Sequence, residues 1–130
     1  MWELHPKKSV GPLFLGMSQD AVLDVLGSDF KEFRRTKDSG ELVLAFHAEA
    51  VQVGIDPYQK ANRIIVHRNR EVQMDGVQLL GRKVSEVAAD LSATSHEFVD
   101  YNSGLYCALQ NIVLIETDGV VDGIEIYLLP

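Results

Sequence analysis

The sequence repeats itself once, at a spacing of half its length. In this chain of 130 residues, Gly76–Gly81 (GVQLLG) matches Gly11–Gly16 (GPLFLG), which lies 65 positions earlier. Over residues 11–33 seven positions are identical, where average composition would give about one or two. A period this long favours two duplicated halves over a solenoid of short units. The identical positions are Gly11, Leu15, Gly16, Val22, Leu26, Glu32 and Phe33.

The first copy predicts a strand, a tight turn and a short helix. Pro12–Leu15 is an apolar run suited to a strand, and Gly16 tolerates the positive φ of a turn. Ser18 is a good N-cap residue and Gly27 is typical of a helix end, so we expect a helix over about Ser18–Leu26. A helix this short is not stable alone in water, so it must pack on other elements.

The second copy predicts the same plan with a weaker helix start. Leu79-Leu80 is the expected strand, and Val84–Leu91 is the expected helix. Lys83 stands where the first copy has its capping serine, which leaves Ser85 as the nearest residue able to cap the helix.

Short apolar or alternating runs elsewhere predict strands joined by short connections. Met1–Val10 is expected to be an extended lead-in, and Arg68–Asp75 a polar connector. Turns are indicated at Lys37–Gly40 and Asn102–Gly104, and hairpins at Asp118-Gly119 and Asp122-Gly123. The expected strands are Phe30–Arg35, Glu41–Phe46 (half-buried), Ala50–Ile55, Arg63–His67, Glu97–Tyr101, Leu105–Gln110, Ile112–Thr117 and an alternating final strand over 124–128.

Together these elements predict an α+β fold. It consists of two tandem β-α-β-β-β repeats that form a largely antiparallel sheet with short helices on one face. We expect one domain over residues 1–130, built of half-repeats at about 11–67 and 76–129. An antiparallel sheet can leave its second face in contact with solvent.

Composition points to a cytoplasmic protein. The 46% apolar content is ordinary for a globular chain, and no apolar run approaches the length of a membrane span. The first residues lack the apolar core of a signal peptide. Cys107 is the only cysteine, so no internal disulfide is expected. Its apolar neighbours favour a buried structural residue over a nucleophile.

Negative charge is concentrated in the second half. The chain carries a net charge of −7, and no Lys or Arg follows Lys83. The acidic residues beyond Lys83 are therefore expected to be unopposed: Glu86, Asp90, Glu97, Asp100, Glu116, Asp118, Asp122 and Glu125. One interpretation is solubility, and the other is attraction of a basic partner. Nucleic acid is disfavoured as a ligand, because it requires a basic patch.

No catalytic or metal-binding pattern is found in the sequence. The four histidines, His5, His47, His67 and His96, do not have the spacing of a zinc site. Glycine-rich phosphate loops and nucleophile-elbow motifs are also missing. Asp118 and Asp122 flank glycines and are interpreted as turn residues, since their spacing is not that of an EF-hand. We therefore expect a non-enzymatic protein without cofactor or metal.

The string from Gly16 to Gly27, G-M-S-x-D-x-V-x-x-x-L-G, resembles a signature of a known group of small domains. That group is similar to the outer-membrane assembly lipoprotein BamE and to beta-lactamase inhibitory protein. The resemblance covers about 17 residues well, and Gly76–Leu91 less well. It implies a short helix packed on an antiparallel sheet whose face binds another protein. This chain departs from the group in having neither paired cysteines nor a lipidation cysteine.

The sequence thus favours a protein-binding module, most concretely an immunity-type inhibitor that binds a basic toxin or enzyme through an acidic sheet face. The alternative is a small-molecule or peptide-binding domain with a pocket between the two halves. An enzyme is the third hypothesis, membrane binding is not expected, and a homodimer through edge strands stays open. The candidate partner-binding residues are Tyr101, Glu116, Asp118, Asp122, Glu125 and Tyr127.

Overall fold

An eight-stranded sheet forms one layer of the computed structural model, which describes residues 1–34, 41–94, 98–101, 104–107 and 110–128. Its strand order is β10-β11-β12-β13-β7-β6-β5-β4, and each neighbouring pair is antiparallel. The strands are β4 (Lys31–Arg34), β5 (Leu42–Phe46), β6 (Val51–Ile55), β7 (Ala61–His67), β10 (Val99–Tyr101), β11 (Gly104–Cys107), β12 (Ile112–Thr117) and β13 (Val120–Tyr127).

A smaller, five-stranded sheet has the order β3-β2-β1-β8-β9. Its β1 and β8 are parallel, with Trp2 opposite Val72. The sequence did not predict this sheet: the expected lead-in contains β1 and β2, and the expected polar connector contains β8. The strand expected at Leu79-Leu80 is found two residues earlier, as β9. Leu79 and Leu80 are buried but follow the end of that strand. The strands are β1 (Trp2–His5), β2 (Ser9–Val10), β3 (Leu13–Phe14), β8 (Val72–Met74) and β9 (Val77–Gln78).

Two short helices complete the layer that contains the smaller sheet. Helix α1 (Gln19–Leu26) has its predicted N-cap, since the Ser18 hydroxyl accepts a hydrogen bond from the Ala21 N–H at 3.1 Å. It ends as predicted at Gly27, whose φ is 87°. Helix α2 (Val84–Ala93) begins after Lys83, which makes no side-chain cap. The expected cap at Ser85 is wrong, because that residue lies inside the helix.

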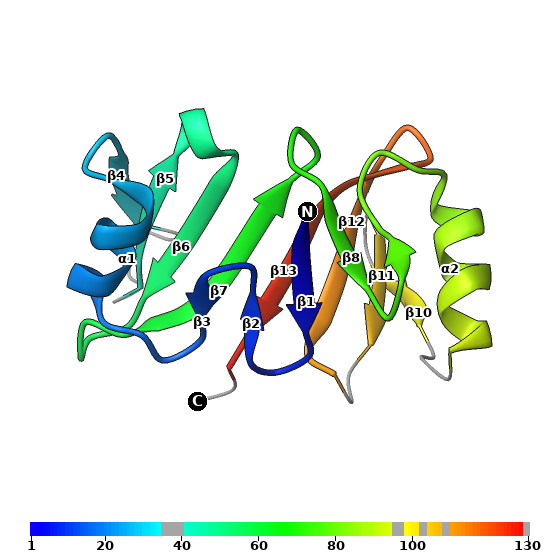
Figure 1. The fold of residues 1–130 in the computed structure, drawn as a ribbon, viewed down its shortest axis with the longest axis horizontal. Helices are drawn as coiled ribbons and strands as arrows, with labels where there is room; N and C mark the ends of the chain where they lie inside the picture. The colour runs from blue at the N-terminus through cyan, green and yellow to red at the C-terminus, as the bar shows by residue number, and fades with distance from the viewer. Residues whose placement is uncertain (35–40, 95–97, 102–103, 108–109, 129–130) are drawn as a thin grey trace.

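Both helices and the smaller sheet lie on the same side of the eight-stranded sheet (Figure 1). The hydrophobic core fills the space between these layers. It includes Val22 of α1, Val87 of α2, Leu4 of β1, Leu44 of β5 and Ile124 of β13, each 2% exposed or less. The α+β class, the mostly antiparallel pairing and the two short helices predicted from the sequence are therefore confirmed.

Several local expectations differ from the structure. Strand β5 is buried on both faces, since Val43 and Ala45 are each only 2% exposed. The Asp118-Gly119 hairpin is confirmed, with φ of 52° and 80°. The second hairpin signal is wrong, because Asp122-Gly123 lies within β13 beside a bulge between Ile115 and Glu116. The expected turn Lys37–Gly40, and residues 102–103 of the other turn, lie outside the described residues.

A short 3-10 helix, η1 (His47–Glu49), lies between β5 and β6. The single cysteine is the last residue of strand β11. Cys107 is 3% exposed, so the expectation of a buried cysteine is confirmed. Its neighbour across the sheet is Ile112 of β12.

Candidate functional site

One face of the eight-stranded sheet points away from the helices and the smaller sheet. Successive side chains of a strand point to opposite faces, so the register assigns each residue to one side. Within the described part of the chain, no helix or strand covers this second face. We call it the open face. Val43 and Ala45 of β5 lie on this face but are only 2% exposed. Among the described residues the face includes Lys31, Phe33, Val43, Ala45, Gln52, Gly54, Arg63, Ile65, His67, Val99, Tyr106, Val113, Ile115, Glu125 and Tyr127.

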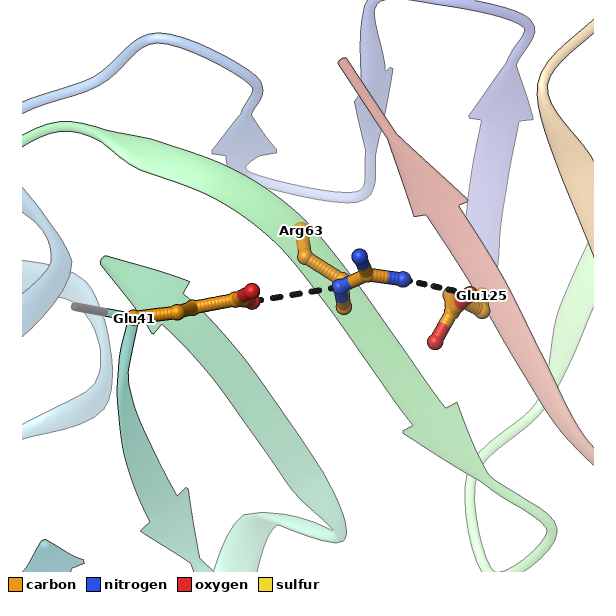
Figure 2. A network of polar contacts seen from close by, with 3 residues as sticks. All are labelled: Glu41, Arg63 and Glu125. Carbon is orange, nitrogen blue, oxygen red and sulfur yellow. Dashed lines mark hydrogen bonds and ion pairs between the residues drawn. The ribbon is translucent and has the colours of Figure 1, made fainter. Parts of the chain in front are cut away.

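An arginine between two carboxylates lies at the centre of the open face. Arg63 Nε donates to Glu41 Oε1 at 3.2 Å, and Arg63 Nη1 donates to Glu125 Oε2 at 2.8 Å (Figure 2). The side chains of Arg63, Glu41 and Glu125 are 26%, 19% and 12% exposed. Charge-assisted hydrogen bonds at this degree of burial are stronger than those at a fully solvated surface. The two bonds therefore hold the guanidinium in one orientation.

Two tyrosines extend this network along the sheet. The Arg63 guanidinium lies 5.7 Å from the centre of the Tyr127 ring, within the range of a cation–π contact. Burial raises the pKa of Tyr127, and its hydrogen bond with Tyr106 and the nearby Glu125 carboxylate raise it further, while Arg63 lowers it. Tyr127 is therefore a neutral phenol at neutral pH. The network joins β7, β11 and β13 through side chains as well as through the backbone.

A hollow of about 110 Å³ opens beside Arg63. It exists partly because Gly54 has no side chain: a Cβ there would lie 2.6 Å from Glu41 Oε1 and 3.0 Å from Asn62 Oδ1. The Asn62 oxygen is buried and accepts no hydrogen bond from the described residues. Apolar and polar side chains both line the hollow, namely those of Phe33, Val43, Gln52, Arg63 and Ile65, together with Gly54.

A second hollow, of about 310 Å³, lies where β5, η1, β6 and β7 meet. It contains His47 and His67, the latter half-buried. Among the described residues no group of three or more His, Cys, Asp or Glu side chains is placed to hold a metal ion. His5 is exposed at the end of β1, and His96 lies outside the described residues. Both hollows lie over the strands of the first half of the chain.

The structure brings together only two of the six predicted partner-binding residues. Glu125 and Tyr127 are two positions apart on β13 and lie on the open face. Glu116 and Asp118 are exposed at the far end of the β12–β13 hairpin. Asp122 lies near that end, and Tyr101 is the last residue of β10, with its side chain outside the description.

The expectation that the later acidic residues are unopposed is wrong for three of them. Arginines that precede Lys83 pair with them across the sheet or along the chain. These pairs are Arg63–Glu125 at 2.8 Å, Arg68–Asp122 at 3.8 Å and Arg82–Asp90 at 2.8 Å. The count along the sequence missed the pairs because it considered only the residues that follow Lys83, whereas the three arginines precede it.

Three residues of the central network were not predicted from the sequence, namely Glu41, Arg63 and Tyr106. A local signal was present, because Arg63 and Ile65 alternate with the buried Ile64 and Val66. That alternation assigns Arg63 to the face opposite the core. It does not name Glu41 or Glu125 as partners, since Glu41 lies just before β5 and Glu125 lies on β13.

Comparison with protein-family models, with curated proteins and with solved structures gave no match. None of the helices in the described ranges is both long enough and apolar enough to span a bilayer. The interpretation of the site therefore rests on its geometry.

Proposed function

We propose that this chain is a non-enzymatic protein-binding module that uses the open face. The observation that carries the proposal is the composition of that face. Phe33, Tyr106 and Tyr127 lie on it with a fixed arginine and with aliphatic residues between them. Aromatic residues and arginine are enriched at protein interfaces, and a rigid, partly buried arginine is a typical hot-spot residue.

A basic partner is favoured by the charge of the chain. The net charge is −7, and the exposed Glu116 and Asp118 add carboxylates at one end of the open face. Such charge speeds the encounter with a protein of opposite sign. In its most concrete form, the module is an immunity-type inhibitor of a basic toxin or enzyme. A cytoplasmic location remains a prediction from the sequence.

We also infer that the chain is one domain made of two tandem half-repeats. Matching hydrogen bonds support this inference: the Gly16 N–H donates to the Ala61 carbonyl at 2.7 Å, and the Gly81 N–H donates to the Val121 carbonyl at 2.9 Å. Gly16 and Gly81 are 65 positions apart, and each bond ties the turn before a helix to the corresponding strand, β7 or β13. The resemblance to the BamE and beta-lactamase inhibitory protein group remains a prediction.

The proposal is tested by capture of partners from the host lysate on the immobilised chain, at low and at moderate salt. We expect one stoichiometric basic protein, with weaker capture at the higher salt, because exposed charges are screened. Mass spectrometry identifies the captured protein, and isothermal titration with the purified protein gives its stoichiometry. Failure to capture any protein at either salt would contradict the proposal.

A matched pair of variants locates the surface. The double variant F33A/V99A removes side chains at the two ends of the open face, where Phe33 is 44% and Val99 61% exposed. The control F14A/V25A removes the same residue types from β3 and α1, where they are 56% and 42% exposed. We expect the first variant to lose capture and the second to keep it. The opposite result would assign binding to the helical side.

The alternative function, small-molecule or peptide binding, is favoured by the hollow beside Arg63. Its volume of about 110 Å³ suits one side chain or one small fragment. It lies over the strands of the first half, whereas the sequence pointed to a pocket between the halves. If no protein is captured while a metabolite mixture raises the melting temperature, this alternative becomes the better description.

A further inference from the structure

We propose that the hollow beside Arg63 anchors the partner by binding a main-chain amide group of an apolar segment of the partner. This inference rests on the proposed function and assigns the chemistry of its central contact. The carbonyl oxygen of the amide accepts a hydrogen bond from Arg63, and the amide N–H donates to Gln52. The occupant is therefore a neutral peptide group flanked by an apolar side chain.

The first support is the donor capacity of Arg63. A guanidinium has five N–H donors, and within the described residues Arg63 uses Nε toward Glu41 and Nη1 toward Glu125. Its Nη2 donors have no acceptor among those residues, and Arg63 lines the hollow. A donor that is this shielded from water gains from an added acceptor.

The second support is that the guanidinium is already oriented. Glu41 immediately precedes β5 and Glu125 belongs to β13, so the arginine is held from two sides (Figure 2). Binding then costs little side-chain entropy, which is the usual advantage of a preorganised contact. Gly54 contributes by leaving space for the Glu41 carboxylate, as an added Cβ would lie 2.6 Å from it.

The third support is the position of Gln52, which offers an acceptor for the N–H of an amide whose carbonyl accepts from Arg63. Gln52 lies opposite Ile65 and Arg63 lies opposite Gly54, so the two side chains are diagonal neighbours on β6 and β7. Such positions are roughly 7–8 Å apart, a span that one amide with two hydrogen bonds can bridge. The carboxamide of Gln52 can accept from an N–H. A carboxylate has acceptors for both Arg63 and the Gln52 NH2 group, but the carboxylates of Glu41 and Glu125 beside Arg63 repel an anion. An ammonium has no acceptor for Arg63.

The fourth support is the apolar part of the lining. Phe33, Val43 and Ile65 supply it, and the Phe33 ring is 44% exposed. The hollow of about 110 Å³ is much larger than the roughly 10–15 Å³ that one water occupies on this measure. It has room for a peptide group with part of an aliphatic side chain, which would bury the exposed ring.

The test uses three fragments that share one branched alkyl group and differ in their polar end: isovaleramide, isovalerate and isoamylammonium. Each is titrated into the isotope-labelled full chain while the NMR signals of Arg63 Nε–H and the Gly54 amide are followed. We expect isovaleramide to shift both signals with a roughly millimolar Kd, in keeping with its size. The two ions should bind about tenfold more weakly, because Glu41 and Glu125 repel isovalerate, while isoamylammonium has no acceptor for Arg63 and is repelled by its charge.

Variants separate recognition from folding. R63K keeps a cation between the two carboxylates but removes Nη2, and Q52L removes the acceptor while keeping a similar volume. Both should lose isovaleramide binding, whereas R68K, at a half-exposed arginine, should keep it. Dispersed NMR spectra of each variant check that it is folded. Tighter binding of either ion, or unchanged amide binding by folded R63K, would overturn the inference.

Failure of the amide anchor can be distinguished from failure of the proposed protein-binding function. If the captured partner requires the open face but isovaleramide does not bind, the amide anchor is wrong and the protein-binding function stands. If isovaleramide binds at Arg63 but no protein is captured, both the protein-binding function and the peptide source of the amide are wrong. An R63K chain that captures the partner as tightly as the unmodified chain would also overturn the anchor.

Discussion

Arg63 and Glu125 form a 2.8 Å ion pair that connects two strands from opposite halves of the sequence. The residues are 62 positions apart, on β7 and β13, which are neighbours at the middle of the eight-stranded sheet. The pair lies on the face away from the core and is mostly shielded from water. It therefore cross-links the centre of the surface that we assign to partner binding.

Removal of Arg63 should destabilise the protein. R63A leaves two largely buried carboxylates close together without their shared donor, and we expect a loss of about 2 kcal/mol in the free energy of unfolding. Urea unfolding at neutral pH measures this loss. A double-mutant cycle with E125Q should show coupling between the two positions, because they contact one another directly.

The matched control is R68A. Arg68 also pairs across the sequence, but its contact with Asp122 is 3.8 Å and the side chains are 50% and 42% exposed. Solvent screens a pair of this kind, so we expect a loss below about 1 kcal/mol. Equal losses for R63A and R68A would contradict the view that burial and geometry set the strength of the central network.

The elements that were predicted from the sequence are those with local signals. Helix α1 has a capping serine at one end and a glycine at the other, and both act as expected. The long strands of the large sheet show alternation over enough residues to be recognised. Strands β1, β2 and β8 have only two to four residues, and β1 pairs with β8 through Trp2 and Val72, far apart in the sequence. Pairing at that distance leaves no local pattern.

The candidate site was predictable only in part for the same reason. Glu125 and Tyr127 belong to one alternating strand, so they could be assigned to a common face. Their contacts with Arg63 and Tyr106 depend on the strand order, which brings β11, β13 and β7 close together. Strand order is a property of the whole sheet and cannot be deduced from any single segment. The charge of Glu125 was therefore interpreted as accessible, although its side chain is only 12% exposed.

The two helix starts should respond in opposite ways to substitution. S18A removes the hydroxyl that accepts from the Ala21 N–H at 3.1 Å, and should cost about 1 kcal/mol. K83S supplies a cap to α2, which has no side-chain cap, and should stabilise the protein by up to about 1 kcal/mol. Chemical unfolding of both variants measures these effects. Stabilisation by S18A, or clear destabilisation by K83S, would contradict the assigned capping roles.

A third prediction concerns Gly11, which packs on the only tryptophan. Gly11 has a φ of 58°, and a Cβ on it would overlap the indole of Trp2. The Arg70 guanidinium lies 3.8 Å from the centre of the Trp2 ring, so displacement of the ring also disturbs this contact. G11A should lower the melting temperature and shift the tryptophan emission toward that of exposed indole.

Gly119 provides the control for backbone strain. Its φ is 80°, and nothing lies within 4 Å of the position of a Cβ. G119A should therefore cost only the strain of a left-handed alanine, about 1–2 kcal/mol, and leave the emission spectrum unchanged. A cost for G11A no larger than that for G119A would show that the Trp2 packing adds nothing to stability.

The last prediction follows from the raised pKa of Tyr127, which burial causes first and the Tyr106 hydrogen bond second. In the unfolded chain this phenol ionises near 10.0, below its folded value. As pH rises, the unfolded state therefore loses its proton first, and ionisation favours unfolding. The contribution of Tyr127 to stability is complete below about pH 10 and falls above it.

Urea unfolding between about pH 9 and 12 tests the effect. We expect the free energy of unfolding to fall more steeply with pH in the unmodified chain than in Y127F, which has no phenol to ionise at this position. Y58F is the control, because Tyr58 is 84% exposed and should leave the slope unchanged. Ultraviolet absorbance of the phenolate follows tyrosine ionisation directly. Identical slopes for Y127F and the unmodified chain would show that Tyr127 ionises as easily in the folded state as in the unfolded state.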